Sequence, residues 1–175
     1  MDVKKVETKI TRFIHSYFAK TKARKAIIGL SGGIDSSLTL LLSVKALGKK
    51  AVIGYIMPSR VTKKQDVKDA LFLCNKYGVK HHKINIEKTA QLLFINQFKA
   101  LKASKARHVI ANIYARVRMI HLYAGANAYN GLVVGSGNKS ELMLGYFTKG
   151  GDGLVDILPL GDLYKTQVRQ LAEYM

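Results

Sequence analysis

The sequence predicts an α/β fold, a doubly wound parallel sheet with helices on both faces. Short apolar runs alternate with amphipathic helical segments, and a serine- and glycine-rich turn stands directly after the first run. Alternation of strand and helix is typical of parallel sheets, in which ligands bind beyond the carboxyl ends of the strands. We therefore expect the chemistry just after Leu30, Met57, Ile86 and Val134.

The first part of the chain predicts three strands with helices before and between them. Asp2 is expected to cap the first helix, Gly48 to close the second, and Pro58 to end the second strand. A capping box over residues 62–65 is expected to open the third helix. These elements are a helix over residues 3–18, a strand over 25–30, a helix over 36–47, a strand over 51–57, a helix from 62 to 77 and a strand over 80–86.

The second part predicts one more strand, preceded by a long helix. Its turn is expected at Asn130 and Gly131, a pair that favours a change of direction. The expected elements are a helix over residues 87–98, a polar connection over 99–106, a helix over 109–129, a strand over 132–134 and a helical segment within 163–175.

Size and composition indicate a single domain over residues 1–175, with 48% hydrophobic and 23% charged residues. The apolar runs are far shorter than the ~20 residues that cross a bilayer, and the chain starts without an apolar signal segment. The single cysteine, Cys74, cannot form an internal disulfide. We therefore expect a cytoplasmic protein without a membrane partner.

The sequence after the first strand predicts a phosphate cradle. It reads Ser31-Gly32-Gly33-Ile34-Asp35-Ser36-Ser37 and leads into a helix. Glycines let the backbone approach an anion, and the N–H groups at a helix start attract one. The spacing is neither that of the Walker loop nor that of dinucleotide-binding folds. Asp35 suits a divalent cation bridging to phosphate, although it could also simply cap the helix.

This turn resembles the PP-loop of the N-type ATP pyrophosphatases, which cleave ATP between the α and β phosphates. Four further strings are similar to the ammonia-dependent NAD synthetase family. They are residues 112–119 (NIYARVRM), 135–141 (GSGNKSE), 145–149 (GYFTK) and 151–166, which includes PLGDLYKT. The resemblance covers about residues 25–175 and implies the Rossmann-like, adenine nucleotide alpha hydrolase-like form of the sheet. It also implies that the family's C-terminal part is missing here.

The resemblance implies roles for individual residues. The ATP-binding residues would be Gly29, Leu30, Ser31, Gly32, Gly33, Ile34, Asp35, Ser36, Ser136 and Lys165. Asp35 and Glu141 would be the Mg²⁺ ligands, and Arg116, Lys149 and Asp156 would contact deamido-NAD. Taken singly, Arg116 and Arg118 could lie on a solvated helix face, Glu141 could serve only the helix dipole and Lys149 could be a loop charge.

The reaction implied is the ATP-dependent amidation of deamido-NAD to NAD with ammonia, through an acyl-adenylate, releasing AMP and pyrophosphate. No side chain acts as a nucleophile: Cys74 is expected in the core, and the adjacent His81 and His82 are expected to be structural. Ammonia would arrive free or from a partner subunit. A homodimer is expected, with residues 109–129 as a contact surface, and the chain alone is expected to bind ATP but turn over poorly.

Two other functions stay open. One is a PP-loop enzyme that modifies tRNA, and the other is a non-catalytic nucleotide- or RNA-binding remnant. The net charge of +18 attracts polyanions, but the lysine-rich stretches 20–25 and 99–105 are expected to be solvated helix ends and loops. Nucleic acid is therefore not an expected partner.

Overall fold

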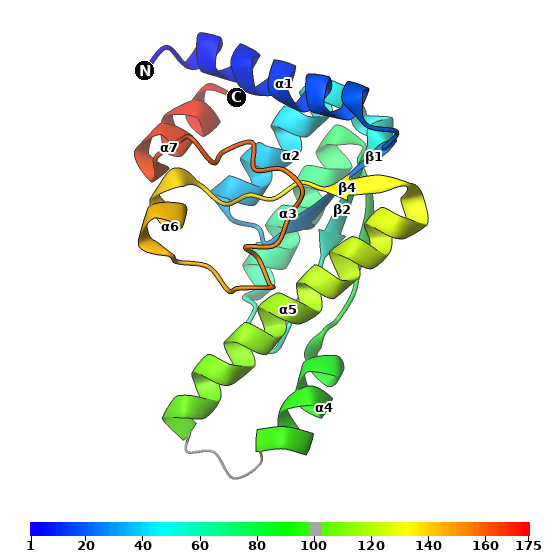
Figure 1. The fold of residues 1–175 in the computed structure, drawn as a ribbon, viewed down its shortest axis with the longest axis vertical. Helices are drawn as coiled ribbons and strands as arrows, with labels where there is room; N and C mark the ends of the chain where they lie inside the picture. Colours follow the sequence, from blue (N-terminus) through cyan, green and yellow to red (C-terminus); the bar gives the residue numbers. More distant parts are fainter. Residues whose placement is uncertain (99–102) are drawn as a thin grey trace.

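The computed structural model describes residues 1–98 and 103–175, and its centre is a four-stranded parallel sheet in the order β3-β2-β1-β4. The strands are β1 (Lys25–Leu30), β2 (Val52–Ile56), β3 (Lys80–Lys83) and β4 (Gly131–Val133). β1 is central and pairs in parallel with both β2 and β4. Helices cover both faces of the sheet (Figure 1), which confirms the predicted fold class.

One face of the sheet carries four helices. They are α1 (Val3–Lys20), α2 (Ile34–Leu47), α3 (Lys64–Tyr77) and α7 (Lys165–Tyr174). Alternate residues of β1, namely Ala26, Ile28 and Leu30, are buried in the core cluster beneath them. Cys74 of α3 is fully buried in the same cluster, as predicted, and burial raises the pKa of its thiol to about 11. A protonated buried thiol fits a core residue and not a nucleophile.

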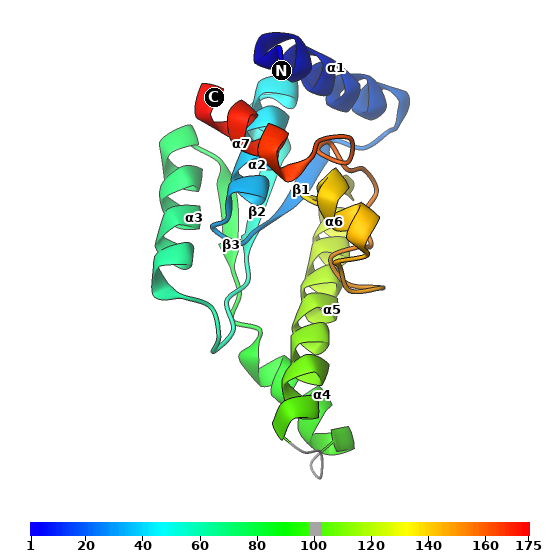
Figure 2. The ribbon, with the colours of Figure 1, turned by 90° about the vertical axis from the view of Figure 1, so that its left-hand side faces the viewer.

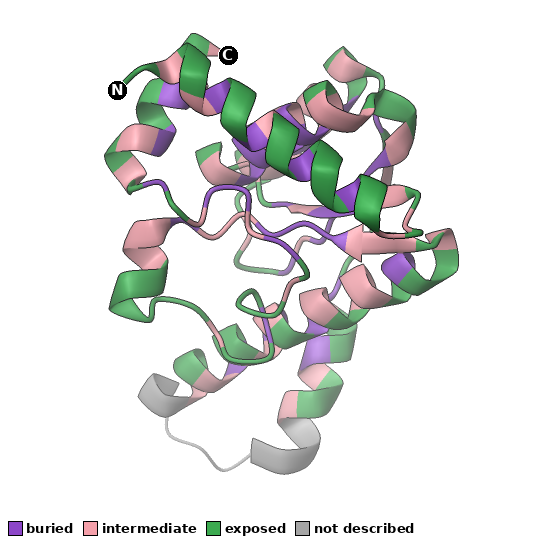
Figure 3. Cartoon of the chain, turned by 45° about the horizontal axis from the view of Figure 1, so that its top comes forward, coloured by how far each residue is buried: buried purple, intermediate pink, exposed green. Residues whose placement is uncertain are grey.

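The other face carries α4 (Glu87–Phe98) and α5 (Ala103–Tyr129), which pack side by side and extend below the sheet (Figures 1 and 2). Ile27 of β1 and Ile53 and Tyr55 of β2 point into a second core cluster with residues of α5. Because successive side chains of a strand point to opposite faces, each central strand serves both clusters. Figure 3 shows the buried residues concentrated along the sheet and on the inner sides of the helices.

The observed boundaries confirm most of the expected elements. Asp2 caps α1, with its carboxylate accepting a 3.0 Å hydrogen bond from the N–H of Lys5, and the predicted bounds of β1 and α4 are those observed. The predicted strand over 80–86 stops at Lys83, and a 3₁₀ turn, η1 (Lys49–Ala51), precedes β2. Of the polar connection predicted over 99–106, residues 99–102 lie outside the described part, and α5 begins at Ala103.

One expectation about a helix start is wrong, and one short helix was not among the expected elements. The predicted capping box does not form, because the hydroxyl of Thr62 accepts a 3.0 Å hydrogen bond from the N–H of Ser59, and α3 starts after Lys63 without a side-chain cap. The short helix α6 (Lys139–Leu144) is not among the expected elements. A capping box formed by Asn138 and Glu141 opens it.

Candidate nucleotide-binding site

A cavity of about 550 Å³ opens at the carboxyl ends of β1, β2 and β4. Its lining comes from the turn after β1, the turn after β2, the inner side of α5 and the long segment that follows β4. The cavity thus lies beyond Leu30, Met57 and Val134, where the sequence predicts the chemistry. The residues just after Ile86 do not line this cavity, and the chemistry expected there stays a prediction.

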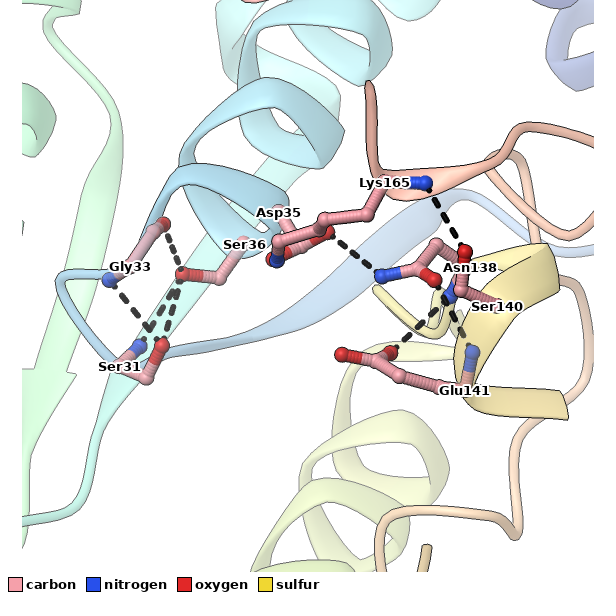
Figure 4. Close-up of polar contacts among 8 residues, drawn as sticks. All are labelled: Ser31, Gly33, Asp35, Ser36, Asn138, Ser140, Glu141 and Lys165. Carbon is pink, nitrogen blue, oxygen red and sulfur yellow. Dashed lines mark hydrogen bonds and ion pairs between the residues drawn. The ribbon is translucent and has the colours of Figure 1, made fainter. Parts of the chain in front are cut away.

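The turn between β1 and α2 forms a narrow loop held by its two serines (Figure 4). The hydroxyl of Ser36 donates to the carbonyl of Gly33 at 2.9 Å and lies 3.1 Å from the hydroxyl of Ser31. The N–H of Gly33 donates to the hydroxyl of Ser31 at 3.2 Å. Because no side chain caps the start of α2, its first N–H groups are free to meet an anion.

Gly32 allows this loop to pack against α3. Its φ of +82° lies in the left-handed region, which favours glycine. A Cβ at this position would overlap the backbone carbonyl of Asp66 in the first turn of α3. The loop that is expected to hold phosphate is thus fitted directly onto a neighbouring helix.

Asn138 brings the two predicted metal ligands to one place (Figure 4). Its side-chain amide donates to Asp35 at 3.0 Å, and its backbone N–H donates to Glu141 at 3.1 Å. Its side-chain oxygen accepts a hydrogen bond from the N–H of Glu141 at 3.1 Å. The carboxamide of Asn138 therefore links α2, which contains Asp35, to α6, which contains Glu141. Asn138 is fully buried, and both carboxylates line the cavity.

The two carboxylates suit a magnesium ion. Mg²⁺ prefers oxygen ligands and commonly takes one or two protein carboxylates, with water and substrate phosphate completing its shell. Asp35 and Glu141 belong to different elements and face one cavity beside the phosphate loop. The described residues contain no group of three or more His, Cys, Asp or Glu side chains that could hold a metal ion, so the assignment rests on this pair.

A lysine reaches the same carboxylate from the last helix. The ammonium group of Lys165, the first residue of α7, bonds the carboxylate of Asp35. Its backbone N–H donates to the hydroxyl of Ser140 in α6 at 3.1 Å, which fixes the start of α7 against α6. Ser136, the remaining predicted ATP contact, lines the cavity. The structure therefore gathers predicted ATP-site residues from three distant segments.

The three predicted deamido-NAD contacts lie outside the cavity lining. Arg116 is exposed on α5, and its Nε donates to the carbonyl of Lys149 at 3.2 Å, so these two residues are neighbours. The carboxylate of Asp156 accepts the N–H of Val133 at 2.7 Å and the hydroxyl of Tyr123 at 3.3 Å. Asp156 thereby attaches the segment after β4 to the sheet edge. Its predicted contact with substrate stays a prediction.

Arg118 is a cavity residue to which the sequence analysis gave no functional role. It lines the cavity and donates to the carbonyl of Met57 at 3.2 Å, and burial lowers the pKa of its guanidinium. Within the described residues no carboxylate forms an ion pair with it. The sequence does indicate that Arg118 faces inward, because it falls four and eight positions after the buried residues Tyr114 and Ile110 on the same side of the helix.

Other predicted structural residues have structural partners. His82 lies between Tyr55 and Tyr129, with its Nε2 3.0 Å from the hydroxyl of Tyr129, and His81 contacts the carbonyl of Val79. Both histidines therefore lack the surroundings of a metal site in the described part of the chain. A search of the same residues finds no helix with the length and apolar character to cross a membrane.

Comparisons with known proteins agree with this geometry. The chain is 46% identical over 174 residues to an NH(3)-dependent NAD(+) synthetase of Staphylothermus marinus, covering 98% of this chain and 62% of the relative. The chain thus spans about three fifths of the length of that curated relative. Among solved structures, an NH3-dependent NAD synthetase from Campylobacter jejuni superposes with a TM-score of 0.90 at 36% identity, over 99% of this chain and 73% of that one.

A second solved structure is equally similar. It is the NMN synthetase from Francisella tularensis, with a TM-score of 0.91 at 35% identity, covering 99% of this chain and 71% of that chain. The model of the NAD synthase family matches residues 6–175. Since this match includes the phosphate loop, the Asp35–Asn138–Glu141 cluster and Lys165, the chain belongs to the NAD synthase family.

Proposed function

We propose that this chain catalyses the ATP-dependent amidation of deamido-NAD to NAD with ammonia as the nitrogen source. The observation that supports it most is the convergence of Asp35, Glu141 and Lys165 beside an uncapped phosphate loop. This arrangement has carboxylates for a cation and a lysine for a leaving phosphate, and the nearby hydroxyls of Ser31 and Ser36 are hydrogen-bonded within the loop. Such a site suits chemistry in which the two substrates react directly with each other.

ATP is proposed to bind with its phosphates on the loop after β1. The contacts would come from Gly29, Leu30, Ser31, Gly32, Gly33, Ile34, Asp35, Ser36, Ser136 and Lys165. Asp35 and Glu141 would hold Mg²⁺, which when bound neutralises phosphate charge and polarises phosphate oxygens. Lys165 would neutralise charge that develops on the pyrophosphate as it leaves. Its contact with Asp35, at the start of α2, supports this role.

The proposed reaction has two steps. A carboxylate oxygen of deamido-NAD attacks the α-phosphorus of ATP, the bond to pyrophosphate breaks, and an acyl-adenylate remains. Ammonia then attacks the acyl carbon, the bond to AMP breaks, and the nitrogen loses a proton to leave the amide. The protein's part is to orient two anionic substrates and to offset their repulsion with cations.

Arg116, Lys149 and Asp156 are proposed to contact deamido-NAD. The hydrogen bond from Arg116 to the backbone carbonyl of Lys149 supports this, because it joins α5 to the loop that contains both Lys149 and the cavity residue Thr148. Two molecules are proposed to form a homodimer through α5, where Ile120 is exposed. Substrate residues that lie outside one chain's cavity are consistent with a site completed at such an interface.

A second candidate substrate is the carboxylate that corresponds to NMN. The comparable superposition on the NMN synthetase of Francisella tularensis supports it, since this fold accommodates both activities at nearly equal identity to this chain. The two substrates carry the same reacting group and differ by the adenylate half. The position of the reacting carboxylate beside ATP would therefore be the same for both.

Measurement of AMP release tests these proposals. The purified chain is mixed with ATP, Mg²⁺ and ammonium, and separately with deamido-NAD, deamido-NMN, tRNA or no further substrate. We expect AMP to depend on deamido-NAD and to appear together with NAD. AMP release with deamido-NMN alone would favour the second candidate, and release with tRNA alone would favour a tRNA-modifying enzyme. ATP binding without AMP in every arm would indicate a non-catalytic nucleotide-binding protein.

A further inference from the structure

Several basic turns lie together at the end of the sheet where the strands begin, opposite the cavity. In a parallel sheet all strands begin at the same end, so the turns that precede β1, β2 and β3 meet at the amino ends of the strands. We call the surface formed by these turns the amino-edge face. Its cationic residues lie in these turns or begin the strand that follows, and they are Lys22, Arg24, Lys25, Lys49, Lys50 and Lys80.

Contacts between these turns make the amino-edge face one continuous surface. The ammonium group of Lys25 donates to the carbonyl of Lys50 at 2.7 Å, which joins the turns before β1 and β2. The side chain of Lys49 lies against Gly78, which joins the turn before β2 to the turn before β3. The start of β4 is connected as well, since Asn130 donates to the carbonyl of Lys22 at 3.1 Å. In Figure 1 the α1–β1 and α5–β4 turns lie together at the right-hand side.

The charges of this face are unbalanced. The chain has 11 acidic residues, and none of them lies in the turns of the amino-edge face. The ion pairs found in the described part of the chain join carboxylates to Lys45, Arg60 and Lys165, none of which belongs to the face. Lys80 lies 4.6 Å from the ring centre of Tyr129, a contact that orients the ammonium without neutralising it. The face is therefore a concentrated positive surface that favours a polyanion.

We propose that the amino-edge face binds the phosphate backbone of a nucleic acid without reading its base sequence. The cations come from turns on adjacent strands, which are about 4.8 Å apart, so several of them can contact phosphates of one backbone at once. A membrane surface fits less well, because the turns before β1, β2 and β3 contain no exposed large apolar side chain to insert among lipids, and the exposed ring of Phe72 lies in α3, outside these turns. The sequence alone predicts that residues 20–25 are a solvated helix end and loop. In the structure this stretch is joined to two further basic turns, and we therefore propose that it belongs to a binding surface.

Salt-dependent binding is the test. Fluorescein-labelled duplexes of RNA and of DNA, each in two unrelated sequences, are titrated with the intact chain and followed by fluorescence anisotropy. The association constant should be independent of base sequence, and its logarithm should fall linearly with the logarithm of the salt concentration. The RNA and DNA arms identify which backbone is preferred. Mg·ATP should not compete, because the cavity lies at the opposite edge of the sheet.

A matched pair of double variants locates the site. Lys49→Ala with Lys50→Ala should reduce the salt slope by about 2 and weaken binding on the order of 30-fold at 0.15 M salt, by loss of two phosphate contacts. Lys4→Ala with Lys5→Ala removes the same charge from the far end of α1 and should change binding little. Circular dichroism confirms that both variants are folded.

Four outcomes would overturn the proposal. They are absence of binding to either duplex at 0.15 M salt, equal weakening by the two double variants, competition by Mg·ATP, and tighter binding to phosphatidylserine vesicles than to either duplex. None of them depends on whether the chain synthesises NAD. Failure of this proposal and failure of the proposed catalytic function can therefore be told apart.

Discussion

At the scale of single residues, Asp35 and Glu141 decide whether the cavity can use ATP with a metal. Asp35→Asn and Glu141→Gln keep the hydrogen bonds that a carbonyl oxygen can accept from Asn138 but remove the negative charge. We expect each variant to fold and to lose Mg²⁺-dependent pyrophosphate release on the order of a hundredfold or more, because the metal contribution is several kcal/mol. Near-normal pyrophosphate release by either variant would contradict the assignment.

Variants of Arg118 and Arg116 distinguish a role inside the cavity from a substrate contact outside the cavity. Arg118→Met should fold, because methionine can fill the same space, but AMP formation should fall about tenfold or more, since a charge-assisted hydrogen bond contributes roughly 1.5–3 kcal/mol. Arg116→Met should mainly raise the KM for deamido-NAD. Reduced unfolding free energy with unchanged activity in Arg118→Met would instead indicate that its bond to the Met57 carbonyl is purely structural.

At the scale of elements, the contact between the phosphate loop and α3 can be measured at Gly32. Gly48 is a matched control, because its φ of +80° is nearly the same as that of Gly32, at +82°, but a Cβ on Gly48 would meet no atom. Both glycine-to-alanine changes should lower the unfolding free energy by about 1–3 kcal/mol, because both residues have a positive φ that L side chains rarely adopt. Gly32→Ala should lose about 1–3 kcal/mol more by overlap with α3.

Denaturant unfolding and ATP binding give the comparison between the two variants. Gly48→Ala should bind ATP normally because Gly48 lies at the end of α2, far from the loop. Equal destabilisation of the two variants would mean that α3 moves away at little energetic cost. In that case the fit between loop and helix would not be a determinant of the site.

Glu87, the first residue of α4, joins the connection after β2 to α5 and makes the stability of the fold depend on pH. Burial alone would raise its pKa, but hydrogen bonds from the Arg60 N–H and the Tyr114 hydroxyl, both 2.8 Å, outweigh it and lower the pKa. A lowered pKa in the folded state stabilises the fold above the ordinary value of 4.5, and this contribution disappears as pH falls through the folded value. The connection after β2, α4 and α5 should therefore loosen together in acid.

The variant Glu87→Gln tests this linkage. At neutral pH its unfolding free energy should be about 1 kcal/mol below that of the parent chain, and the difference should shrink as pH falls below 4.5. Glu173→Gln is the control, because Glu173 is exposed on α7. A difference between parent and Glu87→Gln that stays constant from pH 7 to pH 3 would show that the charge of Glu87 does not matter.

At the scale of the whole molecule, the proposed homodimer makes a measurable prediction. Ile120 of α5 is 56% exposed, and an interface through α5 would bury it. Light scattering should give the mass of a dimer, and Ile120→Glu should shift it toward a monomer. Phe72→Glu is the control, since Phe72 is 65% exposed on α3, on the other face of the sheet. A stable monomer of the parent chain at high concentration would contradict the proposal.

Local sequence was sufficient for most of the secondary structure. The strand over residues 25–30 and the helix over 87–98 were predictable because their apolar periodicity and flanking residues agree. The capping box expected at Thr62 failed because a tertiary arrangement of the turn gave its hydroxyl another partner, Ser59. The helix α6 was missed although Asn138 and Glu141 have capping-box spacing, because six residues carry little periodic signal.

By itself, the sequence determined the alternation of strands and helices, the order of the motifs and the composition of the phosphate loop. These are local properties, set by the spacing of apolar residues and by backbone preferences within a few positions. Only the tertiary structure decided which distant residues meet. Asp35, Asn138 and Lys165 are separated by up to 130 positions, and they are joined by the packing of α7 against α1 and α2 and by the hydrogen bond from Lys165 to Ser140 of α6. The same reason explains why Arg118, and not Arg116, lines the cavity, since the docking of α5 on the sheet selects the side of the helix that faces inward.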